Sequence, residues 1–380
     1  MQTKLSQEEV LRYSRHLLIP QVGLSGQEKL KKASVLIVGT GGLGSPISLY
    51  LAAAGIGKIG LVDYDVVDES NLQRQVIHST ETVGEPKVNS ASQYLKKLNP
   101  YIVIETFNEA ITSENIVRIA ENYQIIVDGT DNFSTRYLLN DYCVFYKKPY
   151  IYGSIFRFEG QVSVFDAQHG PCYRCVFPTP PPPGVVPSCG EGGVFGVLPG
   201  SIGTFQATEV IKLILGLSEN PYGKLYLYDA IDLSIQTIQL RKNPKCIICG
   251  ENPEIITLQD TQFFCDLHDT ESALLAEWEW KPDRLKKALD NGSPLRLIDV
   301  RDPVEREIVF LPGSESIPYE QISSETFTDG ETPVILYCRT GTRSGRVVQK
   351  LRNSGFTNIF NLAGGTNAWV NDVDKDLLKY

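Results

Sequence analysis

The sequence lacks an excess of positive charge. Its 380 residues include 36 lysines and arginines against 45 aspartates and glutamates, a formal net charge of −9. Binding to the nucleic-acid backbone needs clustered lysine and arginine, so this balance argues against a nucleic-acid partner. With 42% hydrophobic and 21% charged residues, the composition is ordinary for a folded protein and excludes collagen, coiled coil and bulk disorder. The length suggests two or three domains.

A pattern for export or membrane insertion is also missing. Residues 1–23 carry glutamate and arginine and have no apolar core of the kind that a signal peptide needs. Residues 33–57 carry no charge, but several glycines and Pro46 interrupt them, which favours a strand, a tight turn and a buried helix over a membrane span. We therefore expect a cytoplasmic protein with no membrane partner.

The first part of the chain has the rhythm of a parallel α/β sheet. Helix-like segments alternate with short runs rich in β-branched residues, which predicts parallel strands joined by helices. The predicted strands are 34–38, 58–63, 102–107 and 124–129, and the predicted helices lie near 46–54, 85–98 and 112–122. Residues 161–166 and 224–230 alternate with a period of two, which indicates additional antiparallel strands.

The last part of the chain repeats this rhythm on a smaller scale. The pattern predicts helices at 282–289 and 344–353 and strands at 295–300, 333–338 and 358–362. We therefore expect a first domain over residues 1–250, a linker over 251–276 and a second, smaller α/β domain over 277–380.

A glycine-rich loop lies between the first predicted strand and the helix that follows it. Residues Gly39 to Gly44 have the sequence GTGGLG, and Asp63 ends the next strand. Glycines let the backbone approach a phosphate closely, and the helix N-terminus favours its negative charge. An acid at this spacing binds ribose hydroxyls. Taken alone, these residues are typical of an NAD- or FAD-binding Rossmann domain.

The residues that follow indicate a different nucleotide chemistry. Arg74 and Lys87 place two cations near the glycine loop, and Asp131 follows the predicted strand 124–129. Hydride transfer needs no such pair of cations, whereas a triphosphate does. A carboxylate at the end of a strand suits a Mg²⁺ ligand. Each of these residues alone would more often be a solvated surface charge, and their joint order is what carries the signal.

Residues 8 to about 250 resemble the E1-like adenylating enzymes that activate the ubiquitin-like sulfur carriers of molybdopterin and thiamine synthesis. The matching positions, in order, are Arg12 to Arg15, the Gly39–Gly44 loop, Asp63, Asn71 to Gln75, Lys87 and Asp131. The resemblance implies a Rossmann-like adenylation domain with a mixed sheet and an ATP site. It also implies that Asp63 binds the ribose, that Gly42 contacts a phosphate and that Asp131 holds Mg²⁺. The residues that would bind the triphosphate are Asn71, Arg74 and Lys87.

The same resemblance implies partners. In this family an arginine of the N-terminal helix reaches into the site of a second subunit, and Arg15 stands at the matching position, followed by His16 where the family usually has glutamine. We therefore expect a homodimer with two composite sites. The implied substrate is a small ubiquitin-like sulfur-carrier protein that ends in Gly-Gly.

Two C-x-x-C pairs suggest a metal site. Cys172 and Cys175 form the first pair, and Cys246 and Cys249 form the second. Two such pairs can supply four thiolates to Zn²⁺, although the gap between them is longer than in compact zinc ribbons, and two unrelated or redox pairs are the alternative. Cysteines in a reducing compartment rarely form disulfides. The E1-like family carries a structural zinc at these positions.

Cys189 lies between a proline-rich stretch and a glycine-rich stretch. Such a segment is either a passive surface connection or a functional crossover loop, and a lone cysteine is most often a small core residue. In E1-like enzymes the crossover loop carries a reactive cysteine, and Cys189 matches it. A thioester, an acyl-disulfide and a resolving thiol all remain open as its role. Cys143 and Cys265 are expected to be structural.

Cys338 lies at the junction between a predicted strand and a helix. Backbone N–H groups of such a loop, together with Arg339 and Arg343, favour a thiolate or a persulfide anion. A tyrosine-phosphatase loop needs five residues between cysteine and arginine, and only four separate Cys338 from Arg343. The region resembles a rhodanese sulfurtransferase domain, whose framework is matched by Leu297 to Arg301, Leu311 to Gly313, Leu362 to Gly365 and Trp369.

Together the two resemblances imply an adenylyltransferase fused to a sulfurtransferase. Such an enzyme activates the carrier's C-terminal glycine with ATP and transfers a persulfide sulfur from Cys338 to give a thiocarboxylate. We expect a role in molybdenum cofactor synthesis, with thiamine, cysteine or tRNA thiolation as the alternatives, and a cysteine desulfurase or another protein as sulfur donor. An NAD-linked oxidoreductase and a domain that only docks partners are the rival interpretations.

Overall fold

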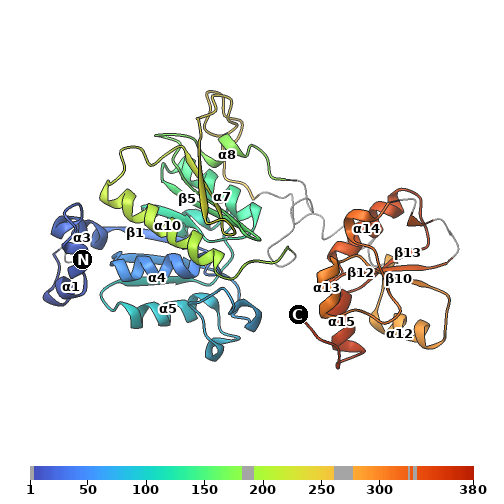
Figure 1. Cartoon of the computed structure of the whole chain (residues 1–380). Coiled ribbons are helices and arrows are strands. Elements are labelled where there is room, and N and C mark those ends of the chain that lie inside the picture. Colours follow the sequence, from blue (N-terminus) through green and yellow to red (C-terminus); the bar gives the residue numbers. More distant parts are fainter. Residues whose placement is uncertain (1–3, 182–191, 261–276, 324–325, 328–331) are drawn as a thin grey trace. The chain divides into compact units, whose positions relative to one another are not determined.

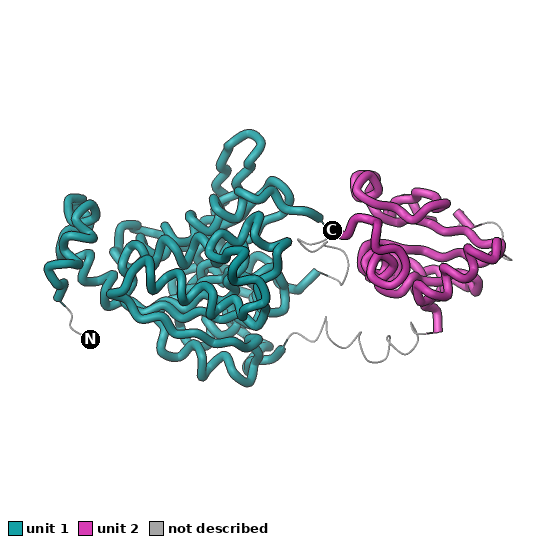
Figure 2. The backbone as a smooth tube through the Cα atoms, turned by 90° about the horizontal axis from the view of Figure 1, so that it is seen from below, with its two compact units in different colours: residues 1–264 teal, residues 265–380 magenta. Residues whose placement is uncertain are grey.

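The computed structural model describes residues 4–181, 192–260, 277–323, 326–327 and 332–380. The chain divides into two compact units, Met1–Phe264 and Cys265–Tyr380 (Figure 2). The division falls inside the segment that the sequence suggests as a linker. Within the described ranges, no helix is long and apolar enough to cross a membrane.

The first unit is built on one mixed sheet of eight strands. The strand order is β3-β2-β1-β4-β5-β6-β7-β8, parallel from β3 to β5 and antiparallel from β5 to β8. The strands are β1 Ser34–Val38, β2 Lys58–Val62, β3 Val103–Phe107, β4 Ile125–Asp128, β5 Tyr150–Phe156, β6 Glu159–Phe165, β7 Lys224–Asp229 and β8 Ser234–Gln239. This arrangement confirms the predicted α/β class, including the antiparallel strands.

Helices cover both faces of this sheet (Figure 1). They are α1 Gln7–Arg12, α2 Ser14–Leu17, α3 Gly23–Lys32, α4 Gly44–Ala54, α5 Lys87–Leu98, α6 Ile116–Ala120, α7 Phe133–Phe145, α8 Tyr173–Val176 and α10 Leu198–Leu215. Residues of α3, α4, α5 and α10 share one hydrophobic core, and residues of α6 and α7 share another. All five residues of β1 are therefore buried, which explains why the four residues after Ser34 form an unbroken apolar run and do not alternate.

The second unit is a smaller parallel sheet of five strands in the order β11-β10-β12-β13-β9. The strands are β9 Glu279–Trp280, β10 Arg296–Asp299, β11 Glu315–Ser316, β12 Val334–Tyr337 and β13 Ile359–Leu362. The helices are α12 Pro282–Asp290, α13 Pro303–Ile308, α14 Thr342–Asn353 and α15 Gly365–Asp372. Apolar clusters that share these strands lie within this unit, as expected for a sheet covered on both faces.

Candidate nucleotide, metal and sulfur-transfer sites

The glycine loop Gly39–Gly44 lies where the strand order reverses. It follows β1, the strand between β2 and β4, and Val38 pairs with both Val62 and Asp128. The carboxyl ends of three parallel strands therefore meet in one row. Ligands of open α/β sheets bind in the crevice beyond such a switch point.

The backbone of this loop is packed too closely for any residue but glycine at two positions. Gly39 has φ of 90°, and a Cβ atom on it would lie 2.6 Å from the carbonyl oxygen of Gly129. A Cβ atom on Gly44 would lie 1.9 Å from the carbonyl oxygen of Gly39. Helix α4 begins at Gly44 without a side-chain cap. The loop is thus a backbone cradle at a helix N-terminus, a geometry that binds phosphate.

Asp63 is fixed beside this cradle by hydrogen bonds to its carboxylate. Oδ2 accepts from the backbone N–H of Thr40 at 2.8 Å and from its hydroxyl at 2.9 Å. Oδ1 accepts from the N–H of Asp65 at 3.0 Å. The half-buried carboxylate is therefore held at the end of β2, next to the loop and open to solvent on one side.

Both predicted cations belong to the same neighbourhood. A Cβ atom on Gly42 would lie 3.7 Å from Cγ of Arg74, which places this arginine directly over the loop. The backbone of Arg74 is held by the carbonyl of Asn71 at 3.1 Å. Lys87 is buried at the start of α5, and its Nζ pairs with Asp65 at 2.9 Å. The structure thus brings Gly42, Asp63, Arg74 and Lys87 together.

Two aspartates near the end of β4 have different surroundings. Asp128 is fully buried, and its carboxylate accepts hydrogen bonds from Thr130, Tyr150 and Arg136. Asp131 is exposed and forms no hydrogen bond or ion pair with any residue that the structure describes. Its charge still reaches Tyr64, whose pKa is raised by burial first and then by Asp65, Asp63 and Asp131. Asp131 is therefore the acid available to a cation.

Two buried side chains at this site were given no role from the sequence. His78 contacts the carbonyl of Thr40 through Nε2 at 3.1 Å and Ser90 through Nδ1 at 2.9 Å, and burial lowers its pKa. Gln75 is buried with no partner for its Oε1 in the described structure. Gln75 belongs to the run Asn71–Gln75 that carries the resemblance, whereas nothing in the sequence marks His78.

These features fit a bound nucleotide triphosphate. The backbone cradle, the two cations and the exposed acid suit phosphates and a divalent cation. The amide of Gln75 lies beside the loop, where a Cβ atom on Gly41 would be 3.4 Å from its Nε2. Its Oε1 is buried without a partner in the described structure, which is costly unless another group donates a hydrogen bond to it.

Arg15 lies away from the glycine loop of its own chain. It is exposed on α2, whose next residue His16 contacts Oε1 of Gln27 at 3.1 Å. Nε2 of Gln27 donates to the carbonyl of Ala54, at the C-terminal end of α4. The glycine loop is at the other end of α4, an 11-residue helix about 16 Å long. The structure therefore does not bring Arg15 to the other predicted residues.

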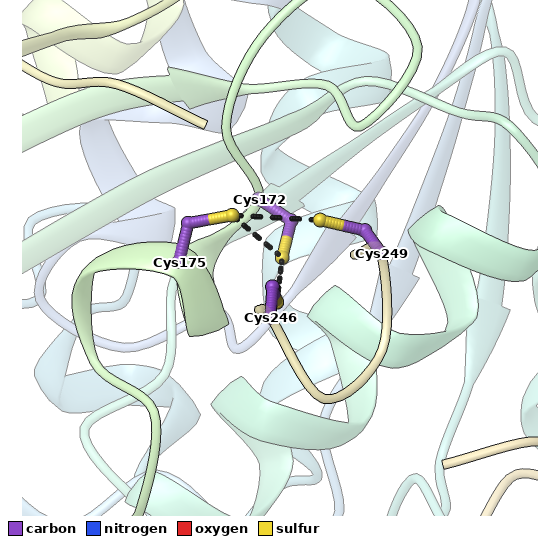
Figure 3. Close-up of side chains that lie close together, drawn as sticks. All are labelled: Cys172, Cys175, Cys246 and Cys249. Atoms are coloured by element: carbon purple, nitrogen blue, oxygen red, sulfur yellow. Dashed lines mark hydrogen bonds between the residues drawn. The ribbon is translucent and has the colours of Figure 1, made fainter. Parts of the chain in front are cut away.

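The four predicted cysteine ligands do converge. Their sulfur atoms all lie within 4.8 Å of one another and point toward a common centre (Figure 3). Cys172 and Cys175 come from the start of α8, and Cys246 and Cys249 from the turn after β8. The closest pairs are Cys172–Cys246 at 3.6 Å, Cys172–Cys175 at 3.8 Å and Cys175–Cys249 at 3.4 Å, with no disulfide among them.

This cluster fits a zinc ion. Zn–S bonds of about 2.3 Å place the sulfurs of a tetrahedral site about 3.8 Å apart, close to the observed spacing. Hydrogen bonding among the sulfurs lowers the pKa of Cys175 and Cys246, above all through Cys172, and raises the pKa of Cys172, above all through Cys175. The pKa of Cys249 is also raised, so the four thiols share their protons unevenly. The backbone N–H of Asn243 also donates to Cys175 at 3.5 Å. Four sulfur donors leave no open position for a substrate, so the site is structural in type.

A buried ion pair fixes the first cysteine pair to helix α7. Nε and Nη2 of Arg174 bind the two oxygens of Asp141 on α7 at 2.7 and 2.8 Å. The guanidinium also lies 4.5 Å from the ring centroid of Tyr137. The metal cluster is therefore anchored to α7, the helix that follows Asp131.

Cys338 lies directly after β12, and α14 begins at Thr342. Cys338 is 1% exposed. Its carbonyl accepts a hydrogen bond from the N–H of Thr366 at 2.9 Å, and a Cβ atom on Gly365 would lie 2.2 Å from the same oxygen. The predicted junction of strand, loop and helix is confirmed, and the loop is fixed against the start of α15.

The two arginines of this loop differ in their partners. Arg343 binds both carboxylate oxygens of Glu305 at 2.7 and 2.6 Å. The pKa of Glu305 is lowered, because the hydrogen bonds from Arg343 and Tyr380 outweigh the opposing effect of burial. Arg339 lies 5.5 Å from the ring centroid of Tyr380. Glu305 thus offsets the charge of Arg343, so the positive charge expected beside Cys338 falls mainly to Arg339. Cys189 lies outside the described residues.

Comparison with known proteins agrees with this geometry. Residues 13–248 match the ThiF family, and residues 281–372 match the rhodanese-like domain. The chain is 46% identical over 384 residues to the "Probable adenylyltransferase/sulfurtransferase MoeZ" of Mycobacterium tuberculosis. This alignment covers 99% of this chain and 96% of that protein. It is 43% identical over 400 residues to the "Adenylyltransferase and sulfurtransferase MOCS3" of Culex quinquefasciatus, covering 100% of this chain and 91% of that protein.

A solved structure shares the fold of the first unit. The crystal structure of E. coli MccB with ATP aligns with a TM-score of 0.54 and 26% identity, covering 63% of this chain and 74% of that one. The chain therefore belongs to the ThiF family, and with its rhodanese-like domain it is an adenylyltransferase and sulfurtransferase of the kind that these relatives represent.

Proposed function

We propose that this enzyme activates the C-terminal glycine of a small ubiquitin-like sulfur-carrier protein with ATP and converts it to a thiocarboxylate. One observation carries the proposal. The carboxyl ends of the parallel strands in the first unit bring together Gly42, Asp63, Arg74 and Lys87, and the same chain holds Cys338 between a strand and a helix. The first set suits adenylation, and the second suits sulfur transfer.

In the first step the glycine carboxylate attacks the α-phosphate of ATP and pyrophosphate leaves. Asp63 binds the ribose hydroxyls, and the amides of the glycine loop bind phosphate. Asn71, Arg74 and Lys87 stabilise the negative charge that develops on the phosphates, the kind of contact that contributes most to such reactions. Asp131 would hold Mg²⁺, which would supply positive charge beside the phosphates.

The adenylation site is completed by a second copy of the chain. Arg15 lies near the C-terminal end of α4 and cannot reach its own glycine loop at the opposite end. In a symmetric dimer the same surface serves both subunits, so each Arg15 can reach the site of the other subunit. Cys172, Cys175, Cys246 and Cys249 would hold a zinc ion, which would stabilise the first unit.

In the second step a persulfide anion on Cys338 attacks the acyl-adenylate and expels AMP. The product is an acyl-disulfide between the carrier and Cys338. Attack by a further thiolate on Sγ of Cys338 breaks the S–S bond, releases the carrier thiocarboxylate and leaves a disulfide on Cys338. A thiol reductant then supplies the two electrons that restore both thiols. Cys189 is the candidate for this thiolate, with a thioester or an acyl-disulfide on Cys189 as alternative routes. Each attack requires an anionic sulfur.

The match to relatives such as the adenylyltransferase and sulfurtransferase MOCS3 supports the pathway that we propose. We assign the enzyme to molybdenum cofactor synthesis in the cytoplasm, with thiamine, cysteine or tRNA thiolation as the alternative. The persulfide sulfur comes from a cysteine desulfurase or another protein donor, and neither nucleic acid nor membrane takes part.

Pyrophosphate exchange into ATP tests the proposal directly. The purified enzyme is incubated with labelled pyrophosphate and, in turn, each of a panel of small carrier proteins that end in Gly-Gly. Exchange with at least one carrier, and none with the same carrier lacking its last two glycines, is the expected result. Absence of exchange with every carrier of the four pathways would overturn the assigned substrate class.

A further inference from the structure

A network of side chains connects Tyr380 to the loop of Cys338. The Tyr380 hydroxyl donates a hydrogen bond to Oε1 of Glu305 at 2.8 Å and accepts one from Nη1 of Arg301 at 2.8 Å. Glu305 in turn binds both terminal nitrogens of Arg343. Tyr380 therefore reaches the first turn of α14 through a single carboxylate.

The ring of Tyr380 contacts the other arginine of the loop. The guanidinium of Arg339 lies 5.5 Å from the ring centroid, within the range of a cation–π interaction. Arg339 directly follows Cys338, and its guanidinium has no carboxylate partner among the described residues. Arg339 is thus the cation of the loop whose charge is available to an anion.

Arg301, which donates a hydrogen bond to Tyr380, is held firmly in place. Arg301 is fully buried, and its Nε and Nη2 bind Asp299 at 2.8 and 2.6 Å. Its Nη2 also donates to the carbonyl of Val309, so Nη1 is the nitrogen directed at Tyr380. Burial, and then the hydrogen bond to Glu305, raises the pKa of Tyr380 to about 12. The hydroxyl therefore keeps its proton and can donate to Glu305 at neutral pH.

We propose that Tyr380 is a positioning residue for the Cys338 loop. Its ring holds the Arg339 guanidinium where the positive charge favours anionic sulfur, and its hydroxyl fixes Glu305 and thereby Arg343. The proposal rests on the proposed function, in which Cys338 carries the sulfur. Reagents that bring a negative charge to Cys338 gain from this arrangement, whereas neutral reagents do not.

Alkylation of the full-length chain by two reagents measures this effect. Iodoacetate is an anion and iodoacetamide is neutral, and mass spectrometry of the Cys338 peptide gives the rate constant for each. We expect Tyr380→Ala to lower the ratio of the iodoacetate rate to the iodoacetamide rate about three- to tenfold at low salt. A charge displaced by several ångströms has an effect of this order, and salt screens it. A loop that is merely loosened changes both rates together and leaves their ratio unchanged.

Matched variants separate the ring from the hydroxyl and from general damage. Tyr380→Phe keeps the ring and should retain most of the ratio. Tyr380→Leu keeps an apolar side chain but has no π face, and it should lower the ratio. Leu378→Ala changes a neutral side chain that is 66% exposed in the same segment and should leave the ratio unchanged. Because Tyr380→Leu leaves a smaller gap than alanine does, it gives a result even if the alanine variant does not fold.

A double variant tests whether Tyr380 acts through Arg339. Arg339→Gln should lower the ratio by itself, and adding Tyr380→Leu should lower it no further. A ratio within about twofold of wild type in both Tyr380→Ala and Tyr380→Leu overturns the proposal, as do effects that multiply in the double variant. Alkylation requires no sulfur transfer, so a failure here is distinct from a failure of Cys338 as sulfur carrier, which Cys338→Ala tests.

Discussion

Asp128 and Arg136 form a buried ion pair at the end of β4, with Nε 3.2 Å from Oδ2 and the Tyr150 hydroxyl 2.6 Å from the same oxygen. Arg136 and Tyr150 therefore already bind the carboxylate of Asp128, at the end of the strand. The next acid along the chain, Asp131, is exposed and free of protein partners in the described structure. The two aspartates therefore have separable roles, which a pair of variants can distinguish.

The first prediction concerns these two acids. Asp131→Ala should reduce carrier-dependent pyrophosphate exchange about 10²–10³-fold, the usual cost of losing a contact that stabilises transition-state charge. Its melting temperature should stay near that of wild type because the side chain is exposed. Asp128→Asn should instead destabilise the fold, because breaking a buried pair typically costs about 3–5 kcal/mol. Near-normal exchange by Asp131→Ala would show that the magnesium ligand is another residue.

The second prediction concerns the four-cysteine cluster. Metal analysis of protein purified without chelator should find zinc at about one ion per chain, the capacity of a single four-thiolate site. Cys246→Ala should lose that zinc and lower the melting temperature, because structural zinc contributes directly to folding. Cys143→Ala is the matched control, since Cys143 is also a buried free cysteine but lies outside the cluster. Zinc-free wild-type protein with full stability would contradict a metal at this site.

The third prediction concerns the sharing of Arg15 between subunits. Arg15→Ala and Lys87→Ala should each abolish exchange as homodimers. A mixed dimer has one doubly altered site and one site with both residues intact. After random subunit exchange, half of the dimers are mixed, so activity should recover to about a quarter of wild type. Mixing two samples of the same variant is the control. If subunits exchange and no activity returns, Arg15 does not act across a dimer.

The fourth prediction concerns His78 and pH. Burial is the main cause that lowers the pKa of His78, and Lys87 adds to it, while the hydrogen bond to Thr40 and the charge of Asp63 oppose it. In the unfolded chain the imidazole of His78 takes up a proton near pH 6.5, whereas in the folded chain it takes up a proton only at lower pH. His78 therefore lowers the stability of the fold as pH falls below about 6.5 and has no such effect above it.

Thermal melts between pH 5 and 8 measure this effect. The melting temperature of the first unit should fall below about pH 6.5 in wild type, and the fall should be shallower in His78→Gln. The glutamine variant is less stable at neutral pH because it loses contacts to Thr40 and Ser90. Equal slopes in the two proteins would show that other groups set the pH dependence.

The sequence predicts the strands better than it predicts the contacts between them. The apolar run at 34–38 and the glycine loop place β1 and the phosphate cradle correctly, because glycine and β-branched residues act locally. The helix expected at 112–122 is shorter, Ile116–Ala120, because Thr112 and Asn115 bond to each other in the turn that precedes it. Local patterns carry no information on which distant groups meet.

Long-range pairs show that limit at the sites. Four cysteines separated by a gap of 70 residues come together only because β7 and β8 return the chain to α8. Glu305, which neutralises Arg343, lies 38 residues earlier on another helix, and no spacing rule in the sequence marks it. The expectation that Arg339 and Arg343 act alike follows from proximity to Cys338, and the carboxylate partner makes them different.

The fifth prediction separates the two halves of the reaction. The candidate ATP residues Asp63, Arg74 and Asp131 belong to the unit Met1–Phe264, and Cys338 belongs to the unit Cys265–Tyr380. Cys338→Ala should therefore leave pyrophosphate exchange within about twofold of wild type, because no interaction made in the adenylation transition state is removed. The same variant should form no thiocarboxylate, which mass spectrometry of the carrier detects as a gain of one sulfur in place of one oxygen.

The outcome of this variant decides how the domains are coupled. Arg343→Gln is the companion control, since it alters the same loop and keeps the cysteine; it should slow sulfur transfer without abolishing it. Loss of both exchange and thiocarboxylate in Cys338→Ala would mean that the second unit takes part in adenylation. Retention of both would mean that sulfur reaches the acyl-adenylate by another cysteine, and Cys189→Ala would then be the variant to examine. If Cys338 is a nucleophile that acts after the carrier has become an acyl-adenylate, its variant should lose thiocarboxylate formation and keep pyrophosphate exchange. No other outcome agrees with that role.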